Sequence, residues 1–107
     1  MERLTTHVLD TAHGKPAAGV GVSLFQGDRL VSRSATNADG RCPEPLALKL
    51  PPGVYRIEFA VGDYFRQQGV ESPFLDCVPV QFTAAAGQSY HVPLVCTPWS
   101  YSTYRGS

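Results

Sequence analysis

Three histidines are the side chains of this 107-residue chain whose ordinary pKa, near 6.5, suits proton transfer at neutral pH: His7, His13 and His91. His7 lies in the run 4–10 and His91 in the run 89–95, and both runs have the composition and alternation of a β-strand. His13 lies in a turn and is expected to be solvated. A single histidine in a strand is more often a hydrogen-bonded structural residue than a catalyst. The pattern alone therefore leaves both roles open for His7 and His91.

Motifs for metal-dependent or covalent catalysis are absent from the sequence. The histidines lack the i,i+4 spacing of a zinc-protease helix, so neither a metal site nor a cofactor is expected. The sequence contains no Gly-x-Ser-x-Gly nucleophile elbow and no glycine-rich phosphate-binding loop. Cys42, Cys77 and Cys96 are widely spaced and include no Cys-x-x-Cys pair, which predicts reduced structural thiols. Covalent catalysis is therefore not supported.

The last ten residues, 98–107, give the chain an aromatic and nearly uncharged end, PWSYSTYRGS. Chain ends are usually polar and frayed unless something holds them in place. An ordinary last strand would explain most of this segment, but it leaves the closing Tyr104-Arg105-Gly106-Ser107 without a reason. We therefore expect this end of the chain to dock against another surface, in the same chain or in a second subunit.

Short runs of β-forming residues between Gly and Pro turns predict the elements that position these residues. Ten Gly and nine Pro residues divide the chain, and such spacing indicates an all-β sandwich or barrel. Seven or eight short strands are expected, including the following runs: 4–10, 20–25, 30–36, 54–60, 77–83, 89–95 and 99–105. One short helix is expected after the fifth strand, over 64–68, with Asp63 as its cap and Gly69 at its end.

Size and charge limit the classes of protein to consider. A length of 107 residues predicts a single domain, 1–107. Nine Lys and Arg balance nine Asp and Glu, and a nucleic-acid binder would need a basic excess. No apolar run is long enough to span a bilayer, and no secretory signal is visible at the N-terminus. We expect a cytoplasmic protein that binds neither nucleic acid nor membranes.

Five segments in a fixed order carry a family resemblance. They are LTTHVLD at 4–10, TNADGR at 36–41, FLD with PV within 74–80, YHVPL at 90–94 and YRGS at 104–107. Together they resemble the signatures of the 5-hydroxyisourate hydrolases, which are enzymes of the transthyretin-like family. One tetrapeptide would be a weak signal, but five colinear segments covering essentially the whole chain are not expected by chance. The resemblance implies a transthyretin-like two-sheet β-sandwich.

The resemblance also implies a reaction and the residues that perform it. The reaction is hydrolysis of 5-hydroxyisourate to 2-oxo-4-hydroxy-4-carboxy-5-ureidoimidazoline in urate degradation, without a cofactor or a metal. The family's catalytic positions fall on His7, Arg41, His91 and Tyr104 of this chain. Its substrate-binding positions fall on these residues: His7, Arg41, Tyr104, Arg105, Gly106 and Ser107.

Physical chemistry suggests a role for each side chain. Arg41 is expected to orient the flat substrate and to stabilise the charge that develops on its carbonyl oxygen, because a guanidinium donates two parallel hydrogen bonds. One histidine would activate water, while the other would orient it or donate a proton. Which histidine does which stays open, with His7 preferred as the base and His91 on the substrate side. Tyr104 is expected to bind the substrate or a histidine, and the Ser107 carboxylate to orient a neighbouring group.

The family also implies an assembly, a homotetramer built as a dimer of dimers with its sites in a channel between the dimers. A domain this small leaves little room for a deep cleft of its own, which fits a shared site. Two alternatives remain: a transthyretin-like carrier of small ligands, and a structural β-sandwich module. The hormone-carrying transthyretins lack the His7, Arg41, His91 and tetrapeptide set, and unpaired polar groups in an apolar channel are costly. That set favours the enzyme.

Overall fold

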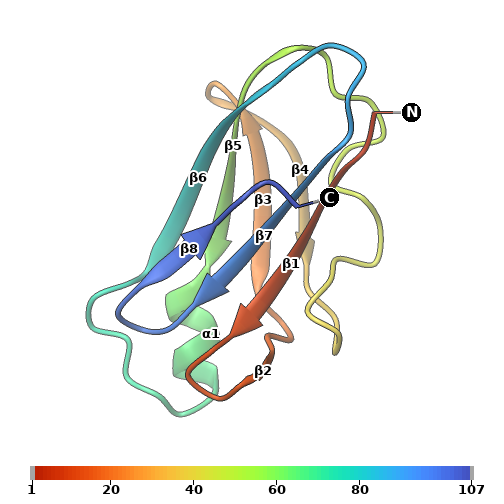
Figure 1. The fold of residues 1–107 in the computed structure, drawn as a ribbon. Helices are drawn as coiled ribbons and strands as arrows, with labels where there is room; N and C mark the ends of the chain where they lie inside the picture. Colours follow the sequence, from red (N-terminus) through yellow and green to blue (C-terminus); the bar gives the residue numbers. More distant parts are fainter. Residues whose placement is uncertain (1, 107) are drawn as a thin grey trace.

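The computed structural model describes residues 2–106, which form two four-stranded β-sheets packed face to face (Figure 1). The first sheet has the order β2-β1-β7-β8, with the bounds Lys15–Pro16, Leu4–Asp10, Tyr90–Cys96 and Tyr101–Thr103. The second has the order β4-β3-β5-β6, with the bounds Arg29–Ala35, Gly21–Gln26, Gly53–Ala60 and Cys77–Ala84. Helix α1, Val61–Gln67, follows β5. The predicted two-sheet sandwich with a helix after the fifth strand is confirmed.

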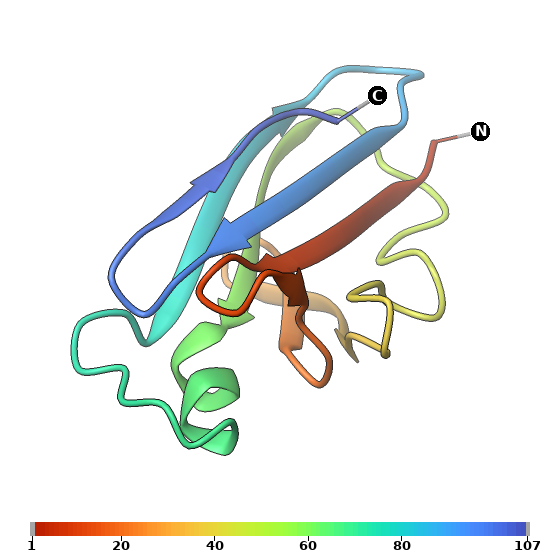
Figure 2. The same cartoon turned by 60° about the horizontal axis from the view of Figure 1, so that its bottom comes forward.

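Strands β1 and β7 lie side by side and parallel, although they come from opposite ends of the chain (Figures 1 and 2). Their register pairs Leu4 with Tyr90, Thr5 with His91 and so on to the end of β1. Strand β8 then turns back antiparallel along β7. The first and last segments of the chain therefore meet on one sheet, as the aromatic C-terminal segment predicted.

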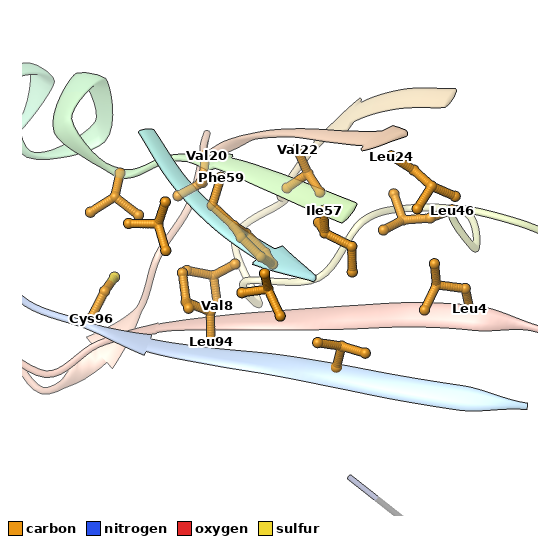
Figure 3. Packing of buried hydrophobic residues seen from close by; sticks show 14 of the residues in the cluster. Leu4, Val8, Val20, Val22, Leu24, Leu46, Ile57, Phe59, Leu94 and Cys96 are labelled. Atoms are coloured by element: carbon orange, nitrogen blue, oxygen red, sulfur yellow. The ribbon is translucent and has the colours of Figure 1, made fainter. Parts of the chain in front are cut away.

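Alternate side chains of the inner strands fill the space between the two sheets. Every second residue of β1 is buried, and those between are partly exposed. Figure 3 shows this core, in which Val8 and Leu94 of the first sheet face Ile57 and Phe59 of the second. Each apolar side chain fully buried in this way contributes about 1.5–3 kcal/mol to folding. The odd-numbered residues of β1, including His7, are left on the outer face of the sheet.

The helix begins earlier than predicted, and its expected cap is wrong. Strand β5 runs directly into α1, so Ala60 is both the last strand residue and the residue before the helix, and it makes no side-chain cap hydrogen bond. Asp63 instead lies in the first turn of the helix, where the positive end of the helix dipole stabilises its carboxylate. It also forms an ion pair with Arg66, with an N–O distance of 3.0 Å. Gly69 follows the helix with φ of 75°, as predicted. No helix within residues 2–106 is long and apolar enough to cross a membrane.

Two strand predictions also need correction. Residues 15–16, which none of the predicted strands includes, form the short strand β2, which pairs antiparallel with Leu9 and Asp10. Strand β8 covers only 101–103 rather than 99–105. The reason is a local turn in which the Thr97 hydroxyl accepts hydrogen bonds from the backbone N–H groups of residues 99 and 100, both at 3.0 Å. This turn removes the first two predicted residues from the strand ladder.

Among residues 2–106, Asp10 is the one buried charged side chain, with no exposed surface. Its carboxylate accepts hydrogen bonds from the Tyr64 hydroxyl at 2.7 Å and from His13 Nδ1 at 2.6 Å. Burial opposes ionisation of Asp10, but the hydrogen bonds from His13 and Tyr64 outweigh it and hold the pKa of the carboxyl below its usual value. His13 is therefore not simply solvated, as the sequence suggested, and the cluster ties α1 to β1.

We expect Tyr64→Phe to lower the free energy of unfolding by about 1.5–3 kcal/mol, because it removes a hydrogen bond to a buried charge. Tyr55→Phe is the matched control: the Tyr55 hydroxyl donates to the neutral Pro51 carbonyl oxygen at 2.6 Å, so about 1 kcal/mol is expected. Urea unfolding of both variants at one protein concentration measures the difference. Equal losses in the two variants would contradict a special role for the Asp10 cluster.

Candidate active site

The outer face of the β1–β7 sheet brings the two strand histidines and the predicted arginine together. Thr5 lies opposite His91 in the register, and His7 shares this face because side chains alternate along a strand. On the far side of β1, Arg41 forms an isolated backbone bridge with His7. On the far side of β7, Gly106 forms a bridge with His91. These predicted residues therefore lie in one strip across the sheet.

The His7 ring is held in one tautomer by the backbone of the neighbouring turn. Its Nε2 lies 2.9 Å from the carbonyl oxygen of Asp39. A carbonyl oxygen can only accept, so Nε2 must carry the proton of this hydrogen bond. The neutral ring then keeps its lone pair on Nδ1. His7 can accept a proton at Nδ1 without losing its hydrogen bond to the turn.

The His91 ring is half-buried and is positioned by a hydroxyl on the adjacent strand. Its Nδ1 lies 2.8 Å from Thr5 Oγ1, and either group can donate. Burial lowers the pKa of His91 below its usual value, and the positive charge of Arg41, together with that of His7 whenever the His7 ring is protonated, lowers it further. The lowered pKa favours the neutral form of the His91 ring, which can both donate and accept a hydrogen bond.

The turn 36–41, which follows β4 and ends at the Arg41–His7 bridge, shapes the site around His7. The Asn37 side-chain oxygen accepts a hydrogen bond from the Arg41 backbone N–H at 3.2 Å. Gly40 has φ of 75°, and a Cβ there would lie 2.5 Å from the Val8 carbonyl oxygen and 3.2 Å from His7 Cδ2. Only glycine fits at this position without displacing β1 or the histidine ring. The predicted turn TNADGR is thus required by the close approach of the chain to His7.

Arg41 and Tyr104 present their polar groups to solvent. Within the part of the chain that the structure describes, neither the Arg41 guanidinium nor the Tyr104 hydroxyl has a hydrogen bond or an ion pair, and Tyr104 is 60% exposed. An arginine without a partner close to two histidines is available to bind a carbonyl or an anion. Tyr104 lines a groove of about 300 Å³ between β6 and β7–β8.

Arg105 and Gly106 lie against β7, whereas Ser107 is outside the described residues. The Arg105 guanidinium stacks on the Tyr90 ring and donates to the Gln88 side chain at 2.9 Å. The Gly106 backbone N–H donates to the His91 carbonyl oxygen at 2.7 Å. The structure therefore brings Gly106 to the histidines but directs the Arg105 side chain away, toward the turn before β7.

A shallow cleft of about 240 Å³ opens beside His91. Besides His91 and Gly106, its walls are formed by residues that the sequence analysis did not single out: Arg3, Thr5, Ser89 and Tyr90. Thr5 could have been found from its spacing, because it is two residues before His7 and shares its strand face. The others depend on the β1–β7 register, which no local pattern reveals.

The remaining candidates for chemistry are set apart from this face. All three cysteines are unpaired, and burial raises the pKa of each thiol, that of Cys96 to about 12. Thiols of this kind stay protonated and are poor nucleophiles. Across residues 2–106 no group of three His, Cys, Asp or Glu side chains is placed to hold a metal ion.

Fold and site together define a small β-sandwich protein that carries histidines and an arginine on the outer face of one sheet. Residues 4–106 match the sequence model of the HIUase/Transthyretin family, and the chain belongs to this family. A 5-hydroxyisourate hydrolase of Mesorhizobium japonicum is 51% identical, with 98% of this chain and 92% of that protein aligned. The resemblance found in the sequence is confirmed.

Solved structures of two kinds share this fold. The 5-hydroxyisourate hydrolase of Klebsiella pneumoniae superposes with a TM-score of 0.90 at 36% identity, over the full length of both chains. Sea bream transthyretin in complex with thyroxine superposes with a TM-score of 0.89 at 29% identity, over 97% of this chain and 94% of that one. The backbone alone therefore does not separate the enzymes from the carriers, and the site residues must.

The electrostatic coupling across the strip gives a direct test of its geometry. We expect Arg41→Gln to raise the pKa of His91, because removing a nearby positive charge makes the imidazolium less unfavourable. A pH titration of the His91 ring signals by NMR measures this shift. Arg33→Gln, at an exposed position of β4 in the other sheet, is the control and should leave the titration unchanged. An unchanged His91 pKa in Arg41→Gln would mean that the two side chains do not interact.

Proposed function

We propose that this chain hydrolyses 5-hydroxyisourate to 2-oxo-4-hydroxy-4-carboxy-5-ureidoimidazoline, the ring-opening step that follows urate oxidation. The observation that carries the proposal is the strip of His7, Arg41 and His91 on one sheet face, in a chain whose relatives bear the name of this enzyme. In the reaction, the oxygen of water bonds to a ring carbonyl carbon and the ring C–N bond breaks. The nitrogen leaves with a proton, and the carbonyl carbon becomes a carboxylate.

His7 acts as the base that takes a proton from the attacking water. The hydrogen bond from Nε2 to the Asp39 carbonyl supports this assignment, because it leaves the Nδ1 lone pair available in the neutral ring. The same hydrogen bond remains in the imidazolium that forms, so protonation needs no rotation of the ring. A base that is already oriented loses little rate to reorganisation.

Arg41 and His91 act on the substrate. The Arg41 guanidinium donates to the carbonyl oxygen on which negative charge develops, and it orients the flat heterocycle. The lowered pKa favours neutral His91, which hydrogen-bonds the substrate, and the leaving nitrogen receives the proton that His7 took from water. Because the reaction needs His91 neutral and its pKa is lowered, the rate should stay high through the usual histidine range and fall only as the pH drops below it.

The active form is a homotetramer in which the site is completed between subunits. Three observations support this part of the proposal. The cleft beside His91 is shallow, the Arg41 side chain is exposed, and Tyr104 does not line the cleft within one chain. Tyr104 would then contribute to a channel between two dimers, by hydrogen bonding to substrate or to a histidine.

Ultraviolet absorbance of freshly made 5-hydroxyisourate tests the activity directly. With protein present, we expect the absorbance to decay many times faster than in buffer, in proportion to the protein concentration. Decay at the spontaneous rate would refute the enzyme. Equilibrium sedimentation tests the assembly separately, and a mass equal to one chain would refute the tetramer.

A small-ligand carrier is the second candidate, favoured by the likeness to the thyroxine-bound transthyretin. A carrier would bind a flat aromatic ligand without consuming it. The polar strip weighs against this function, because a partnerless guanidinium in an apolar ligand channel costs free energy. Saturable thyroxine binding together with decay of 5-hydroxyisourate at the spontaneous rate would establish the carrier instead.

A further inference from the structure

Arg105 makes three contacts within its own chain, all on the turn and strand start that precede His91. Its guanidinium carbon lies 4.1 Å from the centre of the Tyr90 ring. Its Nη2 donates to Gln88 Oε1 at 2.9 Å and to the Ser89 carbonyl oxygen at 3.1 Å. A guanidinium that stacks on a ring and donates to two acceptors at once uses the geometry in which arginine differs from lysine.

The ring under Arg105 is a fixed platform. Tyr90 is 9% exposed, and its hydroxyl accepts a hydrogen bond from the Ala85 backbone N–H at 2.8 Å. Its ring packs against Phe82 with the ring centres 5.7 Å apart. Through this ring, Arg105 is attached to the core of the sandwich as well as to the turn before β7.

The residue after Arg105 lies directly on the His91 ring. The Gly106 N–H donates to the His91 carbonyl oxygen, and a Cβ on Gly106 would come within 2.5 Å of His91 Cδ2. The opposite constraint on this ring is the hydroxyl of Thr5 at Nδ1. The backbone of residue 106 and the Thr5 hydroxyl together set the orientation of the imidazole.

Strand β8 ends at Thr103, so the strand ladder does not hold the residues that follow it. Within the described part of the chain, the Gly106 N–H and the Arg105 side chain are the groups that attach residues 104–106 to the sheet. Among the contacts of the described residues, loss of those of Arg105 would leave the Gly106 backbone hydrogen bond to hold Gly106 on His91. A displacement of about 1 Å at a reacting group can cost as much as 10²-fold in rate.

We propose that Arg105 is a positioning residue that clamps the end of the chain on Tyr90 and Gln88, so that Gly106 holds the His91 ring in its working orientation. This differs from the expectation that Arg105 binds substrate. It rests on the proposed function for its effect on turnover, whereas its effect on the His91 ring is a property of the free protein.

The experiment compares Arg105→Ala and Gln88→Ala with the control Arg33→Ala, which removes an exposed arginine from the other sheet. The first readout is the NMR signals of the His91 ring in substrate-free protein. We expect both clamp variants to shift these signals and the control to leave them in place. The second readout is 5-hydroxyisourate hydrolysis, in which we expect kcat to fall about 10-fold in Arg105→Ala and less in Gln88→Ala, with KM nearly unchanged.

A double variant sharpens the test. If both residues act through one clamp, adding Gln88→Ala to Arg105→Ala should lower kcat no further, because the contact is already lost. A raised KM in Arg105→Ala, with unchanged His91 signals and a silent Gln88→Ala, would overturn the proposal and make Arg105 a substrate ligand. The NMR readout requires no turnover. If the wild-type chain had no hydrolase activity, the proposed function would be refuted, and the His91 ring signals of the variants would still test whether Arg105 positions that ring. If Arg105→Ala does not fold, Gln88→Ala tests the clamp in its place, because it removes one hydrogen bond to Arg105 and keeps the stack on Tyr90.

Discussion

Replacing His7 by glutamine is expected to lower kcat for 5-hydroxyisourate hydrolysis by about 10²–10⁴-fold, the usual contribution of a general base. Glutamine has no basic nitrogen to take the proton from water. Its side-chain NH₂ reaches as far as histidine Nε2 and can still donate toward the Asp39 carbonyl, which His7 Nε2 contacts at 2.9 Å, so the turn that carries Arg41 should keep its shape. The loss therefore reports on proton transfer and not on a collapsed site. Absorbance decay of the substrate measures it.

His13→Asn is the control for this prediction, because His13 lies outside the strip and its partner is the buried Asp10. We expect it to reduce stability but to leave kcat of the folded protein unchanged. Wild-type turnover in His7→Gln would contradict the assignment of the base and would not affect membership of the family. A loss of the same size in both variants would point to a general effect of stability.

Local pattern was a good guide to the fold wherever a strand has one buried face. In β5, Tyr55, Ile57 and Phe59 are buried and alternate with Arg56 and Glu58, as their apolar and charged types predict. Pattern was a poor guide where an element is defined by its neighbours. Strand β2 has only two residues and exists because β1 offers it a free edge. The start of α1 depends on β5 running into it without a loop.

The candidate site, like the fold, has one part that local sequence patterns predict and another part that depends on distant segments. Period-two spacing places His7 on an outer face, and the Asn-Ala-Asp-Gly turn predicts the bend before Arg41. The partner that positions each histidine was not predictable, because it comes from pairing between distant segments. Thr5 and His91 are 86 positions apart, and they meet only through the parallel register of β1 and β7. The partner of His7 is a backbone carbonyl, which no side-chain motif can encode.

Arg41→Lys is expected to lower kcat/KM by about 10²-fold, the scale of losing one group that stabilises the developing oxyanion. Lysine keeps the positive charge but presents it as a single point, without the planar pair of donors that matches a carbonyl in a flat ring. Arg33→Lys on β4 is the matched control and should have wild-type kinetics.

The lysine variant also separates charge from shape, because the charge of Arg41 contributes to the lowered pKa of His91. In Arg41→Lys the charge remains, so the His91 titration should stay close to that of the wild type while turnover falls. In Arg41→Gln both should change, with the His91 pKa raised and turnover at least as low. If Arg41→Lys instead retained the wild-type rate, a point charge would be sufficient at this position. The paired hydrogen bonds assigned to the guanidinium would then be wrong, and the function of Arg41 would be purely electrostatic.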